Sequence, residues 1–364
     1  MQNHLAHEID FTTVRRVLVI KLQHLGDVLL TTPVFSVLKQ LYPGMNIDAL
    51  VFSETTPMLS GNPWVDVIHE VDKSWRKKGT LHLIKQEKHL LAQLKARNYD
   101  LVINFTDRWR GAWLTRLLNP RYSVSQKYSH KRGRWWMKSF THLYSIPYLP
   151  RHTVEIHLDA LRRIGVLPQA TDKKLSFVAG ENADLTIDRL LSGHQLKPDA
   201  YIVVHPTSRW MFKGWNQAGF AEVFRQLTLA GHKLVITSGP DEKEMAYVEE
   251  ILAKQHVEAV NMAGKLTLKE LGALIAKASC FIGLDSVALH MAAALDTPCV
   301  ALFGPSDEKI WHPWQVRHEI ITENYSCRPC NLDGCGSGKI SECLQAIVPQ
   351  KVVKAVNNLL KENG

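Results

Sequence analysis

The sequence predicts an α/β protein of two domains, each a parallel sheet covered by helices on both faces. Short apolar runs typical of buried strands recur along the chain, with helical stretches between them. This alternation stops over residues 165–182 and then restarts. A length of 364 residues also exceeds what one hydrophobic core usually serves.

The expected strands place the two domains along the chain. In the first half, apolar runs at 17–22, 47–52, 65–71 and 101–105 are expected to form strands, and 154–164 has a helical pattern. The second half repeats the alternation, with strands expected at 201–205, 233–238, 259–262, 280–282 and 299–303. We therefore expect a first domain over residues 1–175 and a second over 183–348.

Composition places the chain among ordinary globular proteins, with 45% hydrophobic and 22% charged residues. Residues 1–13 lack the basic region and apolar core of a signal peptide. No run of about eighteen apolar residues occurs, so no spanning helix is expected. We expect the protein to stay in the cytoplasm.

A polar turn between a buried strand and a helix is the most informative local feature. Asp285 and Ser286 follow the apolar run 280–282 and open a helical stretch. The first amides of a helix have no partner within it, and with the helix dipole they favour an anion such as a phosphate. The alternative is that these two residues only cap the helix.

A similar constellation occurs earlier in the same half. Thr207 and Ser208 end the apolar run 201–205, and Lys213 and Trp215 precede a helical stretch. Hydroxyls and cations after one strand predict a second diphosphate-type cradle. The sequence contains no Walker A pattern and no G-x-G-x-x-G, which disfavours P-loop enzymes and dinucleotide dehydrogenases.

Three segments together resemble a known family. They are His205-Pro-Thr-Ser208 with Lys213-Gly-Trp215, Asp285-Ser286 with His290 and Phe303-Gly-Pro-Ser306, and an amino-terminal stretch from Lys21 to Leu29 that contains His24-Leu-Gly-Asp27. The pattern resembles the ADP-heptose:lipopolysaccharide heptosyltransferases, glycosyltransferase family 9. Within that family it is most similar to the enzymes that add the third, branching heptose of the inner core.

The resemblance implies two Rossmann-like domains facing across a cleft, the GT-B type. It implies an inverting transfer of heptose from ADP-heptose to a heptose of the lipopolysaccharide inner core of the Gram-negative envelope, with no cofactor required. It also implies that the last helix, 349–361, packs back onto the first domain.

The resemblance implies that Asp27 is the general base, which takes the proton of the acceptor hydroxyl as that hydroxyl attacks the anomeric carbon. The alternative is a plain helix cap. Lys213 is expected to act in catalysis by neutralising the departing diphosphate.

The remaining donor contacts are expected in the second domain. Glu242 is a candidate for the ribose hydroxyls and Leu266 for the base, although an acidic residue in a first helical turn often only complements the dipole. His290 is expected to face the phosphates, or alternatively the core. The full expected donor set is Thr207, Ser208, Lys213, Glu242, Leu266, Asp285, Ser286 and His290.

Positive charge is concentrated between residues 108 and 138, which carry nine Lys and Arg, no Asp or Glu, and several Trp and Tyr. A solvated face, a nucleic-acid site, an anionic glycolipid site and a membrane surface all fit such a stretch. With the family motifs beside it, phosphorylated inner-core lipopolysaccharide on the cytoplasmic face of the inner membrane is the favoured partner, and no nucleic acid is expected. The expected acceptor residues are Arg108, Arg110, Lys131, Arg132 and Arg134.

Four of the six cysteines cluster near the carboxyl terminus, at Cys327, Cys330, Cys335 and Cys343. The spacing is compatible with a structural zinc or iron–sulfur site but lacks paired C-x-x-C motifs.

Two other functions fit parts of the sequence. One is a nucleotide-sugar 2-epimerase of the same architecture. The other is a metal-containing nucleic-acid-binding protein that uses the basic stretch and the cysteines.

Overall fold

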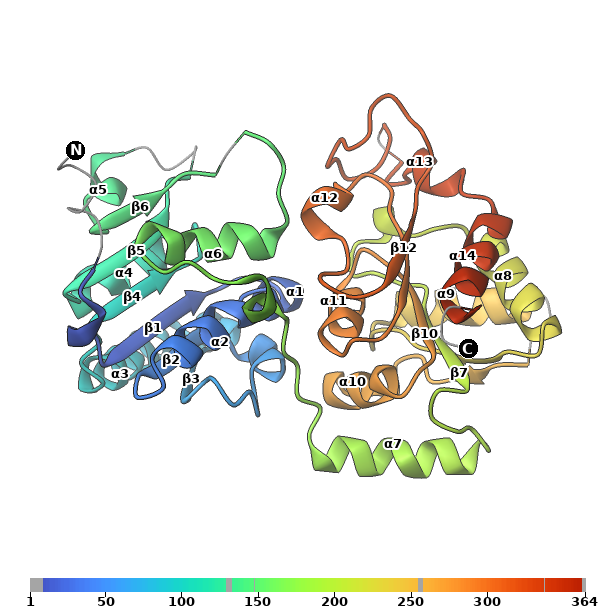
Figure 1. Cartoon of the computed structure of the whole chain (residues 1–364), viewed down its shortest axis with the longest axis horizontal. Coiled ribbons are helices and arrows are strands. Elements are labelled where there is room, and N and C mark those ends of the chain that lie inside the picture. Colours follow the sequence, from blue (N-terminus) through green and yellow to red (C-terminus); the bar gives the residue numbers. More distant parts are fainter. Residues whose placement is uncertain (1–8, 129–132, 147, 255–257, 337, 362–364) are drawn as a thin grey trace. The chain divides into compact units, whose positions relative to one another are not determined.

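The computed structural model describes residues 9–128, 133–146, 148–254, 258–336 and 338–361 (Figure 1). The chain divides into two compact units, Met1–Ser176 and Phe177–Gly364. Each unit contains one six-stranded sheet whose described strand pairs are all parallel. The expected α/β class with two parallel sheets is therefore confirmed.

The first unit is doubly wound, with strand order β3-β2-β1-β4-β5-β6. Its strands are β1 (Arg16–Lys21), β2 (Asn46–Phe52), β3 (Val67–Val71), β4 (Leu101–Asn104), β5 (Tyr122–Gln126) and β6 (His142–Tyr144). Its α-helices are α1 (Leu25–Leu29), α2 (Thr32–Leu41), α3 (Thr80–Ala96), α4 (Trp109–Leu118), α5 (Arg134–Met137) and α6 (Thr153–Arg163). Short 3-10 helices are η2 (Phe11–Thr13), η3 (Ser53–Met58), η4 (Lys73–Lys78) and η5 (Ala170–Lys173).

The second unit repeats this plan with strand order β12-β11-β10-β7-β8-β9. Its strands are β7 (Tyr201–His205), β8 (Lys233–Ile236), β9 (Val260–Asn261), β10 (Cys280–Leu284), β11 (Cys299–Leu302) and β12 (His318–Ile321). Its helices are α7 (Glu181–Gly193), η6 (Met211–Lys213), α8 (Gln217–Leu229), α9 (Glu242–Ala253), α10 (Leu268–Ala276), α11 (Val287–Ala294), α12 (Glu308–Trp311), α13 (Glu342–Gln345) and α14 (Pro349–Lys361).

Helices cover both faces of each sheet, which explains why the central strands read as continuous apolar runs. In the first unit α2 packs with α6 on one face and α3 with α4 on the other (Figure 1). The residues of β4, β7 and β10 are all buried. Burial on both faces holds the strand ends in fixed register, and the site residues follow those ends.

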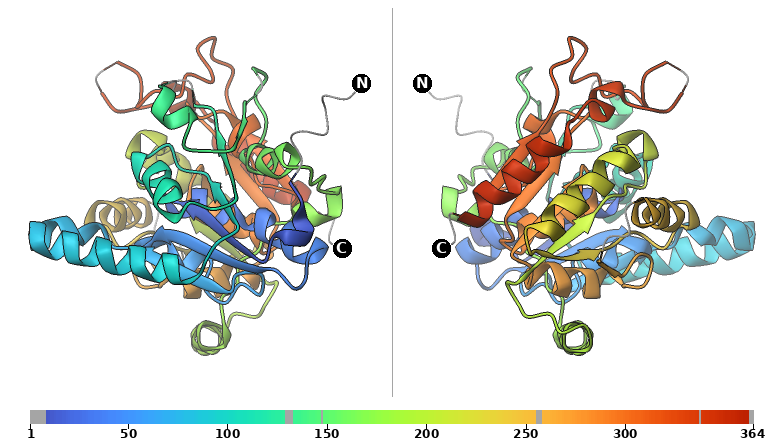
Figure 2. Two further views of the ribbon diagram at one scale, coloured as in Figure 1. Left: turned by 90° about the vertical axis from the view of Figure 1, so that its left-hand side faces the viewer. Right: turned by 90° about the vertical axis from the view of Figure 1, so that its right-hand side faces the viewer.

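The last helix, α14, packs on the second unit. Its buried residues Val352, Ala355, Val356 and Leu359 belong to the same apolar core as β7 and β10. Figure 2 shows α14 alongside α8, and the two helices are in contact. The sequence suggested packing onto the first domain, whereas the structure places the apolar stripe of α14 against the second sheet.

Three strands were not predicted from the sequence: β5, β6 and β12. Strand β5 has the sequence Tyr-Ser-Val-Ser-Gln, whose polar residues hide the apolar signal, and it lies inside the basic stretch. Strands β6 and β12 are short edge strands that are only partly buried. Among the described residues, no helix is both long and apolar enough to cross a membrane.

Candidate active site

Each sheet contains a point at which the strand order reverses. The reversal lies between β1 and β4 in the first unit and between β7 and β10 in the second. Open parallel sheets bind ligands outside the carboxyl ends of their strands at such a point. In the first unit Asp27 and Arg108 follow these strands, and in the second Thr207 and Asp285 do.

The second unit brings the predicted diphosphate residues together. Strands β7 and β10 are hydrogen-bonded neighbours, so the turns after them are adjacent. Thr207 and Ser208 are buried in the first turn, and Asp285 is buried in the second. Lys213 Nζ lies 2.5 Å from Asp285 Oδ2, which joins the two predicted cradles into one site.

Ser286 is the residue before α11, yet its side chain makes no capping hydrogen bond to that helix. Its Oγ is buried and has no hydrogen-bond partner among the described residues. Buried polar atoms are nearly always hydrogen-bonded, so an exception needs a reason. A bound anion would supply the partner, and the helix-cap alternative is not what the structure shows for this side chain.

The acidic residue of α9 that contacts this site is Glu244 rather than Glu242. Glu244 Oε2 accepts hydrogen bonds from Thr207 Oγ1 at 2.6 Å and from the Gly239 backbone N–H at 3.1 Å. Glu242 is the first residue of α9 and is exposed, next to the Asp241 cap. The acidic residue that the sequence favoured therefore lies two positions before the one that contacts the strand ends. The only sequence signal was that Glu244 falls in the same acidic turn.

The other predicted donor residues lie at the same edge of the sheet. Leu266 is half-buried in the turn between β9 and α10. His290 is buried in α11, with its ring centroid 6.3 Å from that of Trp311. His205 ends β7 with its Nδ1 2.9 Å from Thr237 Oγ1, and burial lowers the pKa of His205 to about 4.

In the first unit Asp27 lies on the first turn of α1. Its Oδ2 accepts a hydrogen bond of 3.3 Å from the His24 backbone N–H, so part of the helix-cap alternative is realised. Its Oδ1 lies 3.7 Å from Lys21 Nζ, and the side chain keeps partial exposure. The carboxylate thus has a capping contact, a cationic neighbour and access to solvent.

Two residues next to Asp27 received no role from the sequence. Lys21 Nζ lies 3.0 Å from His157 Nε2, and His157 Nδ1 lies 3.0 Å from the Leu30 carbonyl oxygen. Lys21 and His157 are both buried. Lys21 is part of the amino-terminal motif, but His157 comes from α6 far along the chain, where no local pattern marks it.

The three predicted acceptor residues that the structure describes differ in their contacts. Arg108 Nε donates a hydrogen bond of 3.2 Å to the Leu22 carbonyl, at the same sheet edge as Asp27. Arg110 is paired with Glu87 of α3 at 2.5 Å, so its charge is neutralised. Arg134 is exposed at the start of α5. Lys131 and Arg132 lie outside the described residues.

The aromatic residues of the basic stretch divide between core and surface. Trp136 is fully buried and packs with Ala112 and Phe140. Trp109 and Trp113 of α4 are 46% and 54% exposed. Part of the tryptophan content is therefore structural, and these two α4 side chains present a large apolar surface.

The four clustered cysteines are free thiols. Cys343 is buried in α13 and Cys327 is exposed. Within the described ranges, no three His, Cys, Asp or Glu side chains are placed to hold a metal ion. The structural metal that the spacing suggested stays a prediction.

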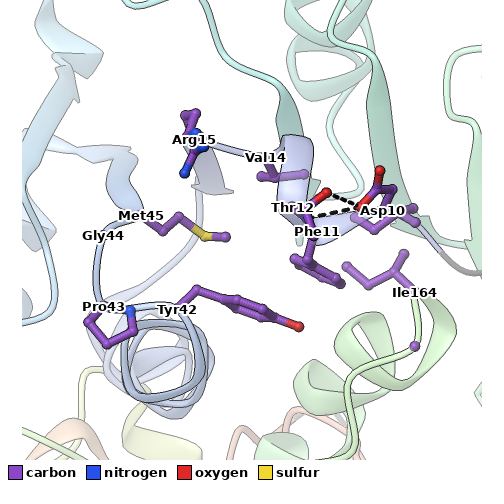
Figure 3. A pocket seen from close by; sticks show the side chains of 12 residues that line it. Asp10, Phe11, Thr12, Val14, Arg15, Tyr42, Pro43, Gly44, Met45 and Ile164 are labelled. Atoms are coloured by element: carbon purple, nitrogen blue, oxygen red, sulfur yellow. Dashed lines mark hydrogen bonds between the residues drawn. The ribbon is translucent and has the colours of Figure 1, made fainter.

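A pocket of about 510 Å³ lies at the opposite edge of the first sheet (Figure 3). It is lined by residues that precede β1 or follow α2 and α6, including Phe11 and Tyr42, whose rings stack at 4.6 Å. None of the predicted site residues lines it. It is not at the edge where parallel sheets bind ligands.

Both doubly wound units carry polar and charged residues at the carboxyl ends of their strands, where such sheets bind ligands. Residues 88–341 match the model of glycosyltransferase family 9 (heptosyltransferase). The chain is also 38% identical over 341 residues to lipopolysaccharide heptosyltransferase 3 of Escherichia coli K12, covering 93% of this chain and 96% of the relative. The chain belongs to glycosyltransferase family 9, and is a glycosyltransferase rather than an epimerase.

Solved structures show the same fold. A family 9 glycosyltransferase from Veillonella parvula superposes with a TM-score of 0.81 at 24% identity, covering 96% of this chain and 97% of that one. The ADP-heptose lipopolysaccharide heptosyltransferase II of E. coli superposes with a TM-score of 0.74 at 22% identity, covering 96% and 99%. The predicted architecture of the GT-B heptosyltransferases is thereby confirmed.

Proposed function

We propose that this glycosyltransferase moves L-glycero-D-manno-heptose from ADP-heptose to a heptose of the lipopolysaccharide inner core, as the third, branching heptose. Support comes from the relative named lipopolysaccharide heptosyltransferase 3 and from the fold of an enzyme named for ADP-heptose. The observation that carries the proposal is the cradle of Lys213, Asp285 and Ser286 at the reversal point of the second sheet.

In this proposal the cradle holds the diphosphate of the donor. Lys213 pairs with Asp285 in the structure, and a diphosphate would share or take over this cation. Ser286 Oγ and the first amides of α11 would donate to the phosphate oxygens. As the bond to the sugar breaks, negative charge grows on the distal phosphate, which these donors stabilise. Thr207 and Glu244 would hold the neighbouring part of the nucleotide through hydrogen bonds.

Asp27 is proposed as the general base on the acceptor side. The hydroxyl of the acceptor heptose loses its proton to the carboxylate as its oxygen attacks the anomeric carbon. Attack from the face opposite the departing ADP inverts the configuration at that carbon. Partial exposure of Asp27 lets an acceptor reach it.

We propose that the exposed face of α4 contacts the membrane that carries the acceptor. Trp109, Trp113 and Leu117 recur every four residues and are 46%, 54% and 46% exposed. No Asp or Glu occurs between Asp107 and Glu155. Trp with flanking cations is typical of helices that lie on anionic bilayers. The protein would act as a peripheral protein on the cytoplasmic face of the inner membrane.

The proposed transfer needs no metal, since Lys213, the hydroxyls and the helix amides supply the positive groups that a cation would otherwise provide. Turnover that survives a chelator supports this. Zinc and iron measured on the purified protein test the prediction made from the cysteines.

The experiment that tests the function incubates the protein with ADP-heptose and inner-core acceptors that carry one or two heptoses. Mass spectrometry should show one added heptose, with the two-heptose acceptor preferred. UDP-sugars serve as the donor control and should give no product. Transfer from a UDP-sugar alone, or no transfer to any core acceptor, would overturn the proposal.

A further inference from the structure

A buried cation, Lys21, lies close to the proposed base, Asp27. Lys21 is the last residue of β1, and its side chain is 7% exposed. Its Nζ lies 3.7 Å from Asp27 Oδ1 and 3.0 Å from His157 Nε2. Lysine is rarely buried unless it is paired, so this placement needs a reason. The proposed transfer uses Asp27 but assigns nothing to Lys21 or His157.

The contacts of His157 fix its tautomer. The Leu30 carbonyl can only accept a hydrogen bond, so Nδ1, which lies 3.0 Å from it, carries the ring proton. Nε2 then has a free lone pair and accepts from the Lys21 ammonium. Burial, helped by the charge of Lys21, lowers the pKa of His157 well below its usual range. His157 is therefore neutral at physiological pH.

The groups around Lys21 determine its charge. Burial lowers the pKa of Lys21, and the carboxylates of Asp27 and Asp107 oppose this effect. Burial, helped by the charges of the same two carboxylates, raises the pKa of the Tyr128 hydroxyl and keeps it neutral. His152 is the other ionisable neighbour that acts on His157. With two carboxylates near and one neutral imidazole as acceptor, Lys21 remains an ammonium.

We propose that Lys21 and His157 are positioning residues for the Asp27 carboxylate. Lys21 attracts this carboxylate and limits its rotation, and His157 holds the Lys21 ammonium in place by accepting a hydrogen bond from it. During transfer the hydroxyl proton goes to Asp27, while Lys21 and His157 keep the protons they already hold. The inference rests on the proposed role of Asp27 as the base.

The first test replaces Lys21 with a neutral residue of similar length, Lys21→Met. A carboxylate without its counter-ion takes up a proton more readily, so the acid limb of the kcat–pH profile should move up by about 1 pH unit or more. The plateau of kcat should fall about tenfold through loss of orientation. The Kd for ADP should not change. Lys95→Met, at an exposed position of α3, is the matched control and should leave the profile unchanged.

A second pair of variants tests His157 and keeps the inference testable if Lys21→Met does not fold. His157→Leu removes the acceptor and should lower kcat with little change in KM for either substrate. His157→Gln offers a carbonyl to Lys21 and an amide N–H to the Leu30 carbonyl, and should restore most of the turnover that His157→Leu loses. Equal loss in both variants would overturn the role of His157.

The outcomes separate this inference from the function on which it rests. An unshifted profile in Lys21→Met with lower kcat would show a merely structural lysine, and a raised acceptor KM alone would show a substrate contact. Either result overturns the inference while the transferase function stands. Near-normal turnover in Asp27→Asn would instead remove the base assignment itself.

Discussion

Asp27 serves two partners with one carboxylate. It caps α1 through the His24 backbone N–H and lies 3.7 Å from Lys21 Nζ. A helix cap and a catalytic group are thus not exclusive alternatives at this residue. Any variant must keep the cap if it is to report on chemistry alone.

Asp27→Asn meets this condition, because Asn retains size and capping ability and loses only basicity. We expect kcat to fall about 10²-fold or more, with an unchanged Kd for ADP and an unchanged melting temperature. Steady-state kinetics measures kcat, and calorimetric titration measures the Kd for ADP. Turnover close to that of the natural protein would contradict the assignment.

Lys213 is expected to act on the donor side. Lys213→Ala leaves Asp285 without its cation and the departing diphosphate without a counter-charge, which should cost about 3 kcal/mol of transition-state stabilisation. Turnover and ADP affinity should fall together. Lys243→Ala, an exposed position of α9, is the control. Normal ADP binding and turnover in Lys213→Ala would show that Lys213 takes no part in donor binding or catalysis.

The buried His205 should make the free energy of unfolding depend on pH in the acid range. Burial lowers its pKa to about 4, whereas an unfolded histidine has its pKa near 6.5. Between these values the unfolded chain binds more protons than the folded one, so the free energy of unfolding should fall as pH drops from about 6.5 to 4, by up to about 3 kcal/mol. His205→Gln should flatten this slope in denaturant titrations at several pH values. A slope equal to that of the natural protein would contradict the burial of a neutral His205.

Among the elements, the strands whose ends carry the site were the most predictable. β1, β7 and β10 are apolar throughout because both sheet faces are covered, and polar turns mark their carboxyl ends. β5 could not be recognised because two of its three buried residues, Ser123 and Ser125, are polar and because it lies within the basic stretch. Glu244 and His157 could not be found in the same way, since their roles depend on helices packed from distant parts of the chain.

A substitution in the amphipathic helix α14 tests whether this helix belongs to the core of the second unit. Val356 is fully buried among residues of the second sheet, so Val356→Ala should destabilise that unit by about 2 kcal/mol. Lys354→Ala, an exposed neighbour, should change little. Thermal unfolding of the two variants checks the difference, and equal effects would contradict the packing.

The exposed face of α4 is expected to bind lipid. Leu117→Asp should weaken binding to vesicles that contain anionic lipid, because it places a negative charge beside Trp113 where apolar and cationic groups meet the surface. Leu185→Asp on α7 starts from 47% exposure, against 46% for Leu117, and is the matched control. Co-sedimentation at two salt concentrations gives the readout. Equal binding of both variants would show that α4 does not face the bilayer.

At the scale of the whole molecule, the two units divide the proposed work. The carboxylate and the exposed basic residues belong to the first unit, and the diphosphate cradle to the second. Each unit has its own sheet and core, so damage to one site should leave binding at the other intact.

Charge reversal of Lys131, Arg132 and Arg134 to Glu tests this division. The acceptor KM should rise and vesicle binding should weaken, most strongly at low salt, because several cations close together in the sequence act jointly on an anionic surface. The Kd for ADP should hardly move. Loss of ADP binding with unchanged acceptor behaviour would assign these cations to the nucleotide or to folding.

The most direct measurement of the central claim is the structure of the product. A scaled reaction of the protein with ADP-heptose and a two-heptose core acceptor is analysed by NMR for the position and configuration of the new linkage. The account predicts one heptose added as a branch on an inner-core heptose, with anomeric configuration opposite to that of the donor. A product with retained configuration, or with the new sugar on a residue other than a heptose, would contradict it.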